Sequence, residues 1–547
     1  MFNYTVMSSI HRALVFIGLF FSTLASAQQL EVVAGNISQN TTWGPDREYL
    51  LTGFVYVKNQ ATLTILPGTV IKGDKNSRGT LIITRGSKLI ADGTRQQPIV
   101  FTSSQASPAP GDWGGVVVCG YAPTNTKTNG INCLGVAEGA INTPYNDAYY
   151  GGGDQPGGCK PDDNSGIIRF VRIEYGGFPF QINNETNGLT LAGVGSGTTV
   201  NYVQVSHSGD DGFEFFGGTV NCKHLISYGS KDDDFDFDLG YQGNVQFALA
   251  IRNPALSDIS GSNGLEIDND NSGTPAIPKT RPNLSNITIV GPTGMMDANY
   301  RRTAHLRRNA EPALFNSLLI GNFPVGIFID GVGTIANAQN NLLEIKNCRI
   351  ADAAELLKST EPTFNISQWF GTANWNNSAV TSSAPFALSS PFDPNIPNAQ
   401  PTLGSSVNDG ASFSSPRATH PFFEPVSYLG AFGPTDDWSC GWAKFQVLNT
   451  NCTVSTEAIP SPLQDLQVAP TITNHSFQLQ LQLTEPTDLS VELYSLSGAL
   501  VEQLLQAPQL QGNYSWTFPT HALSNGFYLV AVRAGSHFQT KKLIIAR

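Results

Sequence analysis

Short apolar runs separated by turn residues fill the chain between residues 53 and 103. Each run holds three to five residues, and Gly, Asn or Pro stands between successive runs. A sandwich would need longer strands, and no two-residue Asn-Gly or Asp-Gly hairpin joins these runs. The pattern is typical of the three short strands in each coil of a parallel β-helix. The runs are residues 54–57, 61–65, 69–71, 80–83, 88–90 and 98–102.

The centre of the chain repeats this pattern with a regular spacing. Val203, Leu225 and Phe247 occupy similar places in three strand-like runs, each 22 residues from the next. A solenoid coil has about this length. We therefore expect an all-β fold in which residues 28–350 form a right-handed parallel β-helix, clearest from residue 50 onwards. Looser continuations of the repeat, with longer loops between them, lie at Ile287, Leu318 and Cys348.

The first residues have the layout of a cleaved secretory signal. A basic start at His11 and Arg12 precedes an apolar run over residues 13–24 and the small-residue exit at residues 25–27. The run is too short to span a membrane as a helix, and no later stretch reaches the roughly 18 apolar residues that a spanning helix needs. We expect residues 1–27 to be removed on export, leaving no transmembrane anchor.

Residues 351–458 differ from the preceding coils, because they are rich in Ser, Asn and Pro. This composition predicts long loops and a cap for the β-helix. One short helical signal is present over residues 352–360. We expect Trp438, Trp442 and Phe445 to close the end of the apolar core.

The last segment, residues 459–547, contains four further strand-like runs. Strict alternation of apolar and polar residues over 489–494 and 526–532 indicates a small antiparallel sandwich. The sequences VELYSLSG (residues 491–498), LSNGFY (523–528) and KKLII (541–545) resemble the type A C-terminal sorting domain of the type IX secretion system.

That resemblance implies export across the outer membrane of a Bacteroidetes-type bacterium, with the secretion machinery as partner. In the family the sorting domain is often cleaved and the body attached to surface lipopolysaccharide. The body also resembles secreted β-helix proteins of those bacteria through residues 66–71, 112–115 and 428–432, which implies a fold and no activity. The residues that carry the sorting motif are Gly498, Gly526, Tyr528, Lys541 and Lys542.

Acidic residues are concentrated in one part of the chain. Residues 201–270 carry twelve acids and three bases, a local charge of 3 − 12 = −9 out of −12 for the whole chain. Nucleic acid is excluded as a partner, because phosphate binding requires the opposite charge. Cations and neutral polymers, including polysaccharides, fit this composition better.

Seven cysteines remain in the mature chain, and export allows them to form disulfides. The nearest candidate pairs are Cys119 with Cys133 and Cys440 with Cys452. Cys222 and Cys348 lie in apolar strand patterns, which favours buried free thiols. No Cys-x-x-Cys motif is present, so a zinc ribbon is excluded.

Three coils share a pattern in which an acid follows an apolar residue that begins a strand. Successive side chains of a strand point to opposite faces, so Glu214, Asp236 and Glu266 are expected to point outward while their neighbours point inward. Stacked coils would place these acids in a ladder with a spacing of about 4.8 Å. Counting along the repeat makes Arg307 the next rung, where it would relieve the repulsion on Glu266.

Besides the acidic ladder, a second pattern indicates a metal site, namely the run Asp268-Asn269-Asp270-Asn271-Ser272-Gly273. Oxygen-bearing residues at positions 1, 3 and 5 before a turn Gly are typical of calcium loops. Position 12 is Lys279, where an EF-hand requires Glu, so this is not an EF-hand. We expect Asp268, Asp270 and Ser272, or the ladder of Glu214, Asp236 and Glu266, to bind Ca²⁺.

The acidic region also resembles part of the polygalacturonase active site. Asp210-Asp211-Gly212 and Asp232-Asp233 match two of the family motifs and lie about one coil apart. Asn263 stands where the family has His, and Arg307 belongs to a half-kept fourth motif. The resemblance implies a glycoside hydrolase or polysaccharide lyase whose carboxylates act as acid and base. Its candidate catalytic residues are Asp211, Asp232, Asp233 and Arg307.

Three functions therefore stay open: a cation- or glycan-binding surface module, a polysaccharide-active enzyme, and a structural adhesin. The pattern favours the first, because any solenoid with a 22-residue coil reproduces the spacing of the enzyme motifs. A plain solvated acidic surface, with no ligand, is the simplest explanation of the ladder.

Overall fold

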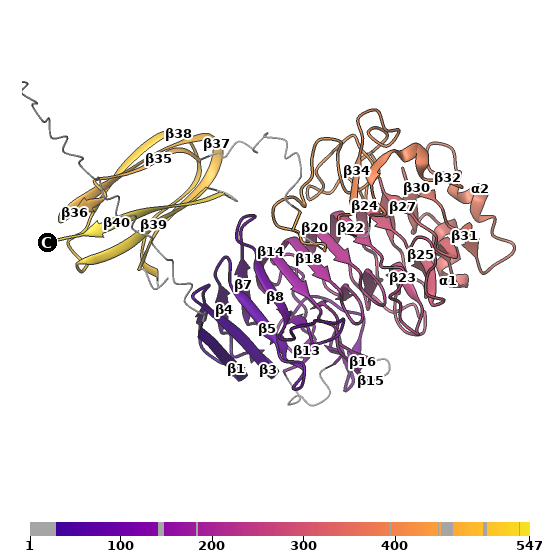
Figure 1. The fold of residues 1–547 in the computed structure, drawn as a ribbon, viewed down its shortest axis with the longest axis horizontal. Helices are drawn as coiled ribbons and strands as arrows, with labels where there is room; N and C mark the ends of the chain where they lie inside the picture. The colour runs from indigo at the N-terminus through magenta and orange to yellow at the C-terminus, as the bar shows by residue number, and fades with distance from the viewer. Residues whose placement is uncertain are drawn as a thin grey trace, which may run out of the picture.

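The computed structural model describes residues 29–139, 147–181, 184–393, 395–446, 448–449, 463–495, 500–534 and 537–547. Twenty-six of its strands form one continuous parallel sheet that winds into a β-helix (Figure 1). The expected all-β solenoid is confirmed. The strands align in three ladders, because each strand pairs with the strand one coil before and one coil after it.

The first ladder carries the acidic residues. Its strands are β3 (Arg47–Val57), β6 (Thr80–Ile83), β9 (Val116–Cys119), β17 (Leu189–Ala192), β19 (Phe213–Phe216), β21 (Phe235–Asp238), β23 (Ser262–Ile267), β25 (Tyr300–Leu306), β28 (Val325–Ile329) and β31 (Glu355–Ser359).

The second ladder lies along the next side of each coil. Its strands are the first parts of β1 (Gln29–Ile37) and β3, followed by β5 (Val70–Gly73), β8 (Ile99–Ser103), β14 (Gly166–Glu174), β18 (Thr199–Ser206), β20 (Asn221–Tyr228), β22 (Asn244–Ile251), β24 (Asn283–Val290), β27 (Leu318–Ile320), β30 (Arg349–Ala351) and β32 (Ser378–Val380).

The third ladder combines short strands with the first halves of β14, β18, β20, β22 and β24. The short strands are β2 (Thr41–Trp43), β4 (Thr62–Ile65), β7 (Lys88–Asp92), β26 (Ala313–Phe315) and β29 (Glu344–Lys346). Four two-stranded hairpins lie outside the ladders: β10 (Lys127–Thr128) with β11 (Ile131–Asn132), β12 (Gly135–Val136) with β13 (Tyr149–Tyr150), β15 (Pro179–Gln181) with β16 (Asn184–Glu185), and β33 (Leu388–Ser390) with β34 (Asn398–Pro401).

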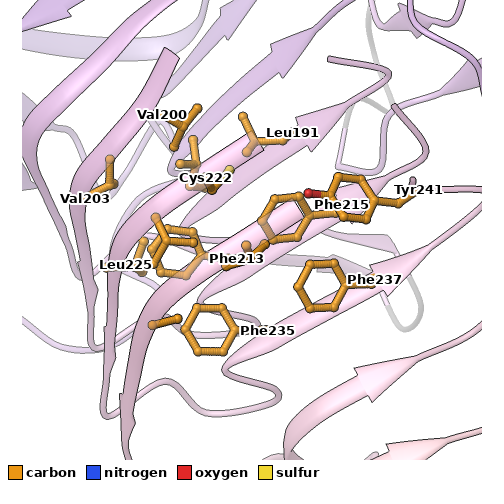
Figure 2. Close-up of a cluster of buried hydrophobic side chains, with 14 of the residues drawn as sticks. Leu191, Val200, Val203, Phe213, Phe215, Cys222, Leu225, Phe235, Phe237 and Tyr241 are labelled. Carbon is orange, nitrogen blue, oxygen red and sulfur yellow. The ribbon is translucent and has the colours of Figure 1, made fainter. Parts of the chain in front are cut away.

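The apolar core fills the space between the ladders. Alternation along β19 and β21 turns Phe213, Phe215, Phe235 and Phe237 inward, where they stack coil on coil (Figure 2). The ring centroids of Phe213 and Phe235 are 5.3 Å apart, and those of Phe215 and Phe237 are 4.6 Å apart. All four side chains are at most 1% exposed. The inward orientation of these residues fixes the acids between them on the outer face of the same strands.

A second stack marks the bend between the third and second ladders. One residue in each of five coils has a left-handed backbone conformation, with φ between 48° and 59°, and the chain bends there. These residues are Phe170, Tyr202, His224, Phe247 and Asn286. Tyr202 and His224 stack with their ring centroids 4.1 Å apart.

This bend corrects the repeat inferred from the sequence. Val203 pairs with Leu225 as expected, but Leu225 pairs with Ala248, so Phe247 takes the bend position. Ala248 in turn pairs with Ile287, whereas Leu318 pairs with Thr288, one residue away from the expected register. The coil from Val203 to Leu225 has 22 residues, the next, to Ala248, has 23, and the one after, to Ile287, has 39, so a fixed 22-residue count cannot follow them.

The predicted helix over residues 352–360 is wrong. Glu355–Ser359 is strand β31, because pairing with β28 supplies its backbone hydrogen bonds and overrides its local helix propensity. The helices are instead α1 (Val332–Gln339), α2 (Ile366–Phe370) and the 3₁₀ turn η1 (Ala384–Phe386). None of the helices among the described residues combines the length and the apolar character needed to cross a bilayer.

Residues 398–446 run back along the outside of the second ladder rather than over the end of the core. Trp438, Trp442 and Phe445 pack in a separate apolar cluster with outward-facing residues such as Ile226 and Leu249. The expected position of these three aromatic residues at the end of the core is therefore wrong. The core residues of the last coils are instead joined by Phe364, Ile366 and Phe370 in and beside α2.

Side-chain amides hold this returning segment in place. The Gln204 amide donates to the Lys444 carbonyl at 2.6 Å and accepts from the Lys444 N–H at 2.8 Å. Gln246 pairs in the same way with both backbone groups of Glu424. These amides act as an extra backbone strand would, so the segment is fastened to the coils without joining a ladder.

The last six strands form their own sheet: β35 (Leu463–Ala469), β36 (Ile472–Thr473), β37 (Ser476–Ser495), β38 (Leu500–Pro519), β39 (Gly526–Ala534) and β40 (His537–Ile545). Their pairings are antiparallel, apart from a parallel pair between β36 and β40. Tyr528 lies in β39 and its hydroxyl donates to the Ser524 carbonyl at 3.0 Å. Lys541 and Lys542 pair with Val530 and Leu529 across β39 and β40.

Gly526, the first residue of β39, pairs with Ile545 at the end of β40. Gly498 and the predicted signal peptide, residues 1–27, lie outside the described residues.

The disulfide prediction needs one correction. Cys133 bonds to Cys159, whereas Cys119 is a buried free thiol in β9. Cys119 belongs to the apolar cluster on the first ladder, and sequence distance alone could not show this. Cys222 and Cys348 are buried free thiols as predicted. Cys440 is disulfide-bonded, and its expected partner Cys452 lies outside the described residues.

Candidate metal centre

The predicted acidic ladder exists on the outer face of the first ladder. Glu214 pairs with Asp236, and Asp236 pairs with Glu266 on the next coil. The ladder is not the solvated surface that the sequence allowed, because Glu214 is 4% exposed and Glu266 is 9% exposed. The loop before β23 lies against it, where the Ser260 hydroxyl donates to Asp232 at 2.6 Å.

A second set of polar side chains lies at the turn before each of these strands. The Asn187 Oδ1 accepts the Asp211 N–H at 3.2 Å, and the Asp211 Oδ1 accepts the Asp233 N–H at 2.7 Å. The Asp233 Oδ1 in turn accepts the Asn263 N–H at 2.5 Å. Each side chain thus caps the backbone of the following coil, so Asp211 and Asp233 have a structural role of their own.

The two sets together bring carboxylate oxygens very close. Ligand atoms of three overlapping groups lie within 4.8 Å of one another: Asp211 with Glu214 and Asp236, Asp211 with Asp232 and Asp233, and Asp233 with Asp236 and Glu266.

Several of these carboxylate oxygens accept no hydrogen bond. Among the described residues, the buried atoms Glu214 Oε1, Asp232 Oδ1 and Asp236 Oδ1 have no hydrogen-bond partner. An unsatisfied buried carboxylate oxygen is strongly unfavourable, so each needs a proton or a cation.

Burial and mutual repulsion raise the pKa of the carboxyls in this cluster. Burial is the larger cause for Asp211, Glu214, Asp233 and Asp236, and neighbouring carboxylates add to it, so each pKa lies well above its ordinary value. Burial also raises the pKa of Asp232 to about 7. These groups ionise together near neutral pH only when something compensates their charge.

The far end of the ladder is compensated by basic residues. Although burial opposes it, the hydrogen bond with His305 and the charge of Arg307 lower the pKa of Glu266. His305 Nδ1 lies 3.3 Å from Glu266 Oε2, and Arg307 donates to Glu266 and to Asp268. The uncompensated charge is therefore concentrated around Asp211, Glu214 and Asp236.

The expected position of Arg307 was wrong by two residues. His305 is the residue that pairs with Glu266, and Arg307 follows two residues later. An irregular register between β23 and β25 and a long intervening loop displaced the count. The predicted contact between Arg307 and Glu266 is nevertheless present.

The predicted calcium turn has different contacts. Asp268 is 3% exposed and receives hydrogen bonds from Arg307 and from Arg308, the latter at 2.7 Å. Asp270 accepts the backbone N–H groups of Ser272 at 2.8 Å and of Thr274 at 3.1 Å. Asp268 and Asp270 thus have protein partners and do not belong to the converging carboxylate groups. Calcium binding at this turn stays a prediction.

The four predicted catalytic residues come together around one small cavity. Asp211, Asp232, Asp233 and Arg307 line a space of about 110 Å³, together with Asp236, Ser260, Gly261, Glu266 and Arg302. This space accommodates about three or four water molecules, whereas pockets for small organic ligands usually exceed about 300 Å³.

Sequence reasoning missed the residues that are not acidic. His305 bridges Glu266 and Asp330, with Nδ1 3.3 Å from Glu266 Oε2 and Nε2 3.1 Å from Asp330 Oδ2. Asn187 and Asn263 were not identified as the two ends of the capping series. Their position directly before the turn Gly188 and Gly264, as Asp211 precedes Gly212, is the signal that could have identified them.

Two family comparisons cover most of the chain. Residues 35–387 match the pectate-lyase like beta helix domain. Residues 469–546 match the secretion system C-terminal sorting domain. A search of curated proteins found no match.

Proposed function

The chain belongs to the pectate-lyase-like β-helix family and ends in a type IX secretion sorting domain. From this premise we propose that its body is a surface module that binds a divalent cation. The sorting domain marks the protein for secretion or for display at the cell surface. The proposed ligands are Asp211, Glu214 and Asp236, and Ca²⁺ is the cation that their chemistry suits best.

One observation carries the proposal. Three carboxylates meet within 4.8 Å, and the buried Glu214 Oε1 and Asp236 Oδ1 have no hydrogen-bond partner among the described residues. Two oxygens that bind the same Ca²⁺ at 2.3 to 2.6 Å are separated by up to about 5 Å, which agrees with this spacing. The adjoining cavity reaches Asp211 and Asp236, so water could complete the six to eight oxygen ligands that calcium takes.

Calorimetric titration of the full chain with CaCl₂ tests the proposal. We expect one site with a dissociation constant of about 10⁻⁵ to 10⁻³ M, the span from calcium sensors to extracellular modules. Glu214→Gln/Asp236→Asn should abolish the heat. Asp270→Asn is the matched control, because it removes one carboxylate from the predicted calcium turn and leaves the ladder intact. Loss of binding in the control alone, or no binding to the wild-type chain, would refute the site.

A polysaccharide-active enzyme is the second candidate, and one observation favours it. Asp232, with its pKa raised to about 7 by burial, opens into the cavity beside Asp211 and Asp233 and could exchange a proton at neutral pH. The geometry favours it less, because the cavity is smaller than a sugar ring requires and Asp211 and Asp233 each cap a backbone N–H. Hydrolysis or cleavage of an acidic polysaccharide that disappears in Asp232→Asn would establish it.

A further inference from the structure

The ligands of the proposed cation come from two successive coils of the β-helix. Asp211 and Glu214 belong to the coil of β19, whereas Asp236 belongs to the coil of β21. An ion held by all three connects the coils side chain to side chain, in addition to the backbone pairs from Phe213–Phe235 to Phe216–Asp238. Without the ion, the same carboxyl groups must either take up protons or repel one another across the junction between the coils.

Neighbouring parts of the first ladder do not place uncompensated acids opposite one another. On one side, Glu214 pairs with Thr190, and Thr190 pairs with Val117, so no acid opposes another. On the other side, the Glu266 carboxylate is held by His305 and Arg307. The junction between β19 and β21 is therefore the weakest electrostatic contact along this face.

Three arginines lie near the junction: Arg302, which lines the cavity, lies over the Phe328 ring at 5.2 Å, and the other two are paired with carboxylates. Arg252 is fully buried and lies 3.3 Å from Asp234, with one N–H donated to the Lys231 carbonyl. Arg307, which also faces Asp236, donates to Glu266 and Asp268. Neither guanidinium is placed to replace a cation between Glu214 and Asp236.

The opposite flank of the same coils is well fastened. Gln204 and the Lys444 backbone hold the returning segment against β18, and His224 packs against Trp438 with ring centroids 5.1 Å apart. Opening of the junction is thus confined to the acidic face, while the rest of the coil stays wound.

We propose that a divalent cation locks the coil of β19 to the coil of β21, so that the acidic face is closed with the cation bound and opens locally without it. This inference rests on the cation site proposed above. It gives the site a regulatory role, because the shape of this face then follows the concentration of the cation outside the cell.

Hydrogen–deuterium exchange of the full chain, in excess CaCl₂ and in excess chelator, tests the lock. We expect removal of the cation to accelerate exchange about tenfold or more for the backbone amides of β19 and β21 and their preceding turns. The amides of β4 and β7, which lie far from the acids in the sequence and in another ladder, should not change.

The double variant Glu214→Gln/Asp236→Asn separates the lock from a general effect of calcium. It removes both the repulsion and the ligands, so its β19 and β21 amides should exchange slowly with and without calcium.

Each outcome decides between distinct conclusions. Calcium that binds by calorimetry but leaves the exchange of β19 and β21 unchanged would overturn the lock and leave the cation site standing. Equal acceleration in all three ladders would also overturn it, because the effect would then be global. Absence of any calcium binding would remove the cation site and the lock together.

Discussion

Replacing Glu214 by Gln should stabilise the protein when no divalent cation is present. Glu214 lies within 4.8 Å of carboxylate oxygens of both Asp211 and Asp236. At this distance two charges repel by about 3 kcal/mol at an effective dielectric constant near 20. Proton uptake relieves part of the repulsion in the wild-type cluster, so we count the gain from one pair, about 3 kcal/mol.

This gain corresponds to a rise of about 6 °C in Tm, at roughly 2 °C per kcal/mol for a large domain. The assay is thermal unfolding of wild type and Glu214→Gln in excess chelator at pH 8, followed by tryptophan fluorescence. In excess calcium the difference in Tm should nearly disappear, because the wild-type site gains about 2.7 kcal/mol at a calcium concentration 100 times the dissociation constant and the variant loses a ligand.

A variant that melts below wild type in chelator would refute the reasoning, because Glu214 would then make a favourable contact that the structure does not show. Equal stabilisation of both proteins by calcium would refute it as well. Asp270→Asn is the matched control, and it should respond to calcium as wild type does.

Four further predictions follow from the same structure. The metal-free chain should become less stable as the pH rises from about 4 to 7, because Asp232 has an ordinary pKa of 3.8 when unfolded and about 7 when folded, so the folded state holds more protons in that window; thermal melts that show the opposite slope in this window would contradict the burial of the cluster. Phe215→Ala should cost about 3 to 5 kcal/mol, because the ring is fully buried and stacks on Phe237; chemical denaturation measures it, and a loss under 1 kcal/mol would place the ring outside the core. Cys133→Ser/Cys159→Ser should lower the stability by about 3 kcal/mol through loss of the loop closure over 26 residues, and an equal Tm with and without reductant would contradict the pairing. Gln204→Ala should loosen the returning segment, seen as earlier proteolysis between residues 436 and 446, whereas unchanged protection would show that the two hydrogen bonds to Lys444 do not hold it.

The sequence predicted the parts of the fold that depend on local alternation. Short apolar runs and the spacing of Val203 and Leu225 were sufficient for a parallel β-helix. The alternation Phe213-Glu214 and Phe235-Asp236 was sufficient to place rings inside and acids outside. These features follow from the two-residue period of a strand, which does not depend on distant residues.

The environment of the acids could not be predicted in the same way. The enclosure of Asp232 and Asp236 depends on the loop that brings Ser260 and Gly261 to the cavity that these acids line, and no local pattern encodes that contact. The prediction that Arg307 pairs with Glu266, where the structure has His305, was wrong for the same reason. Long loops change the number of residues between one coil and the next. The predicted disulfide partner of Cys133 was wrong because Cys159 is close to Cys133 only in the folded chain.

The central claim is that a divalent cation binds between Glu214 and Asp236, and a crystal structure of the chain grown in CaCl₂ tests it most directly. We expect an anomalous difference peak within about 2.3 to 2.6 Å of Glu214 Oε1, Asp236 Oδ1 and an oxygen of Asp211. No peak at that position, with the carboxyl groups in direct hydrogen-bond contact through shared protons, would contradict the account, and so would a calcium ion found only at Asp270.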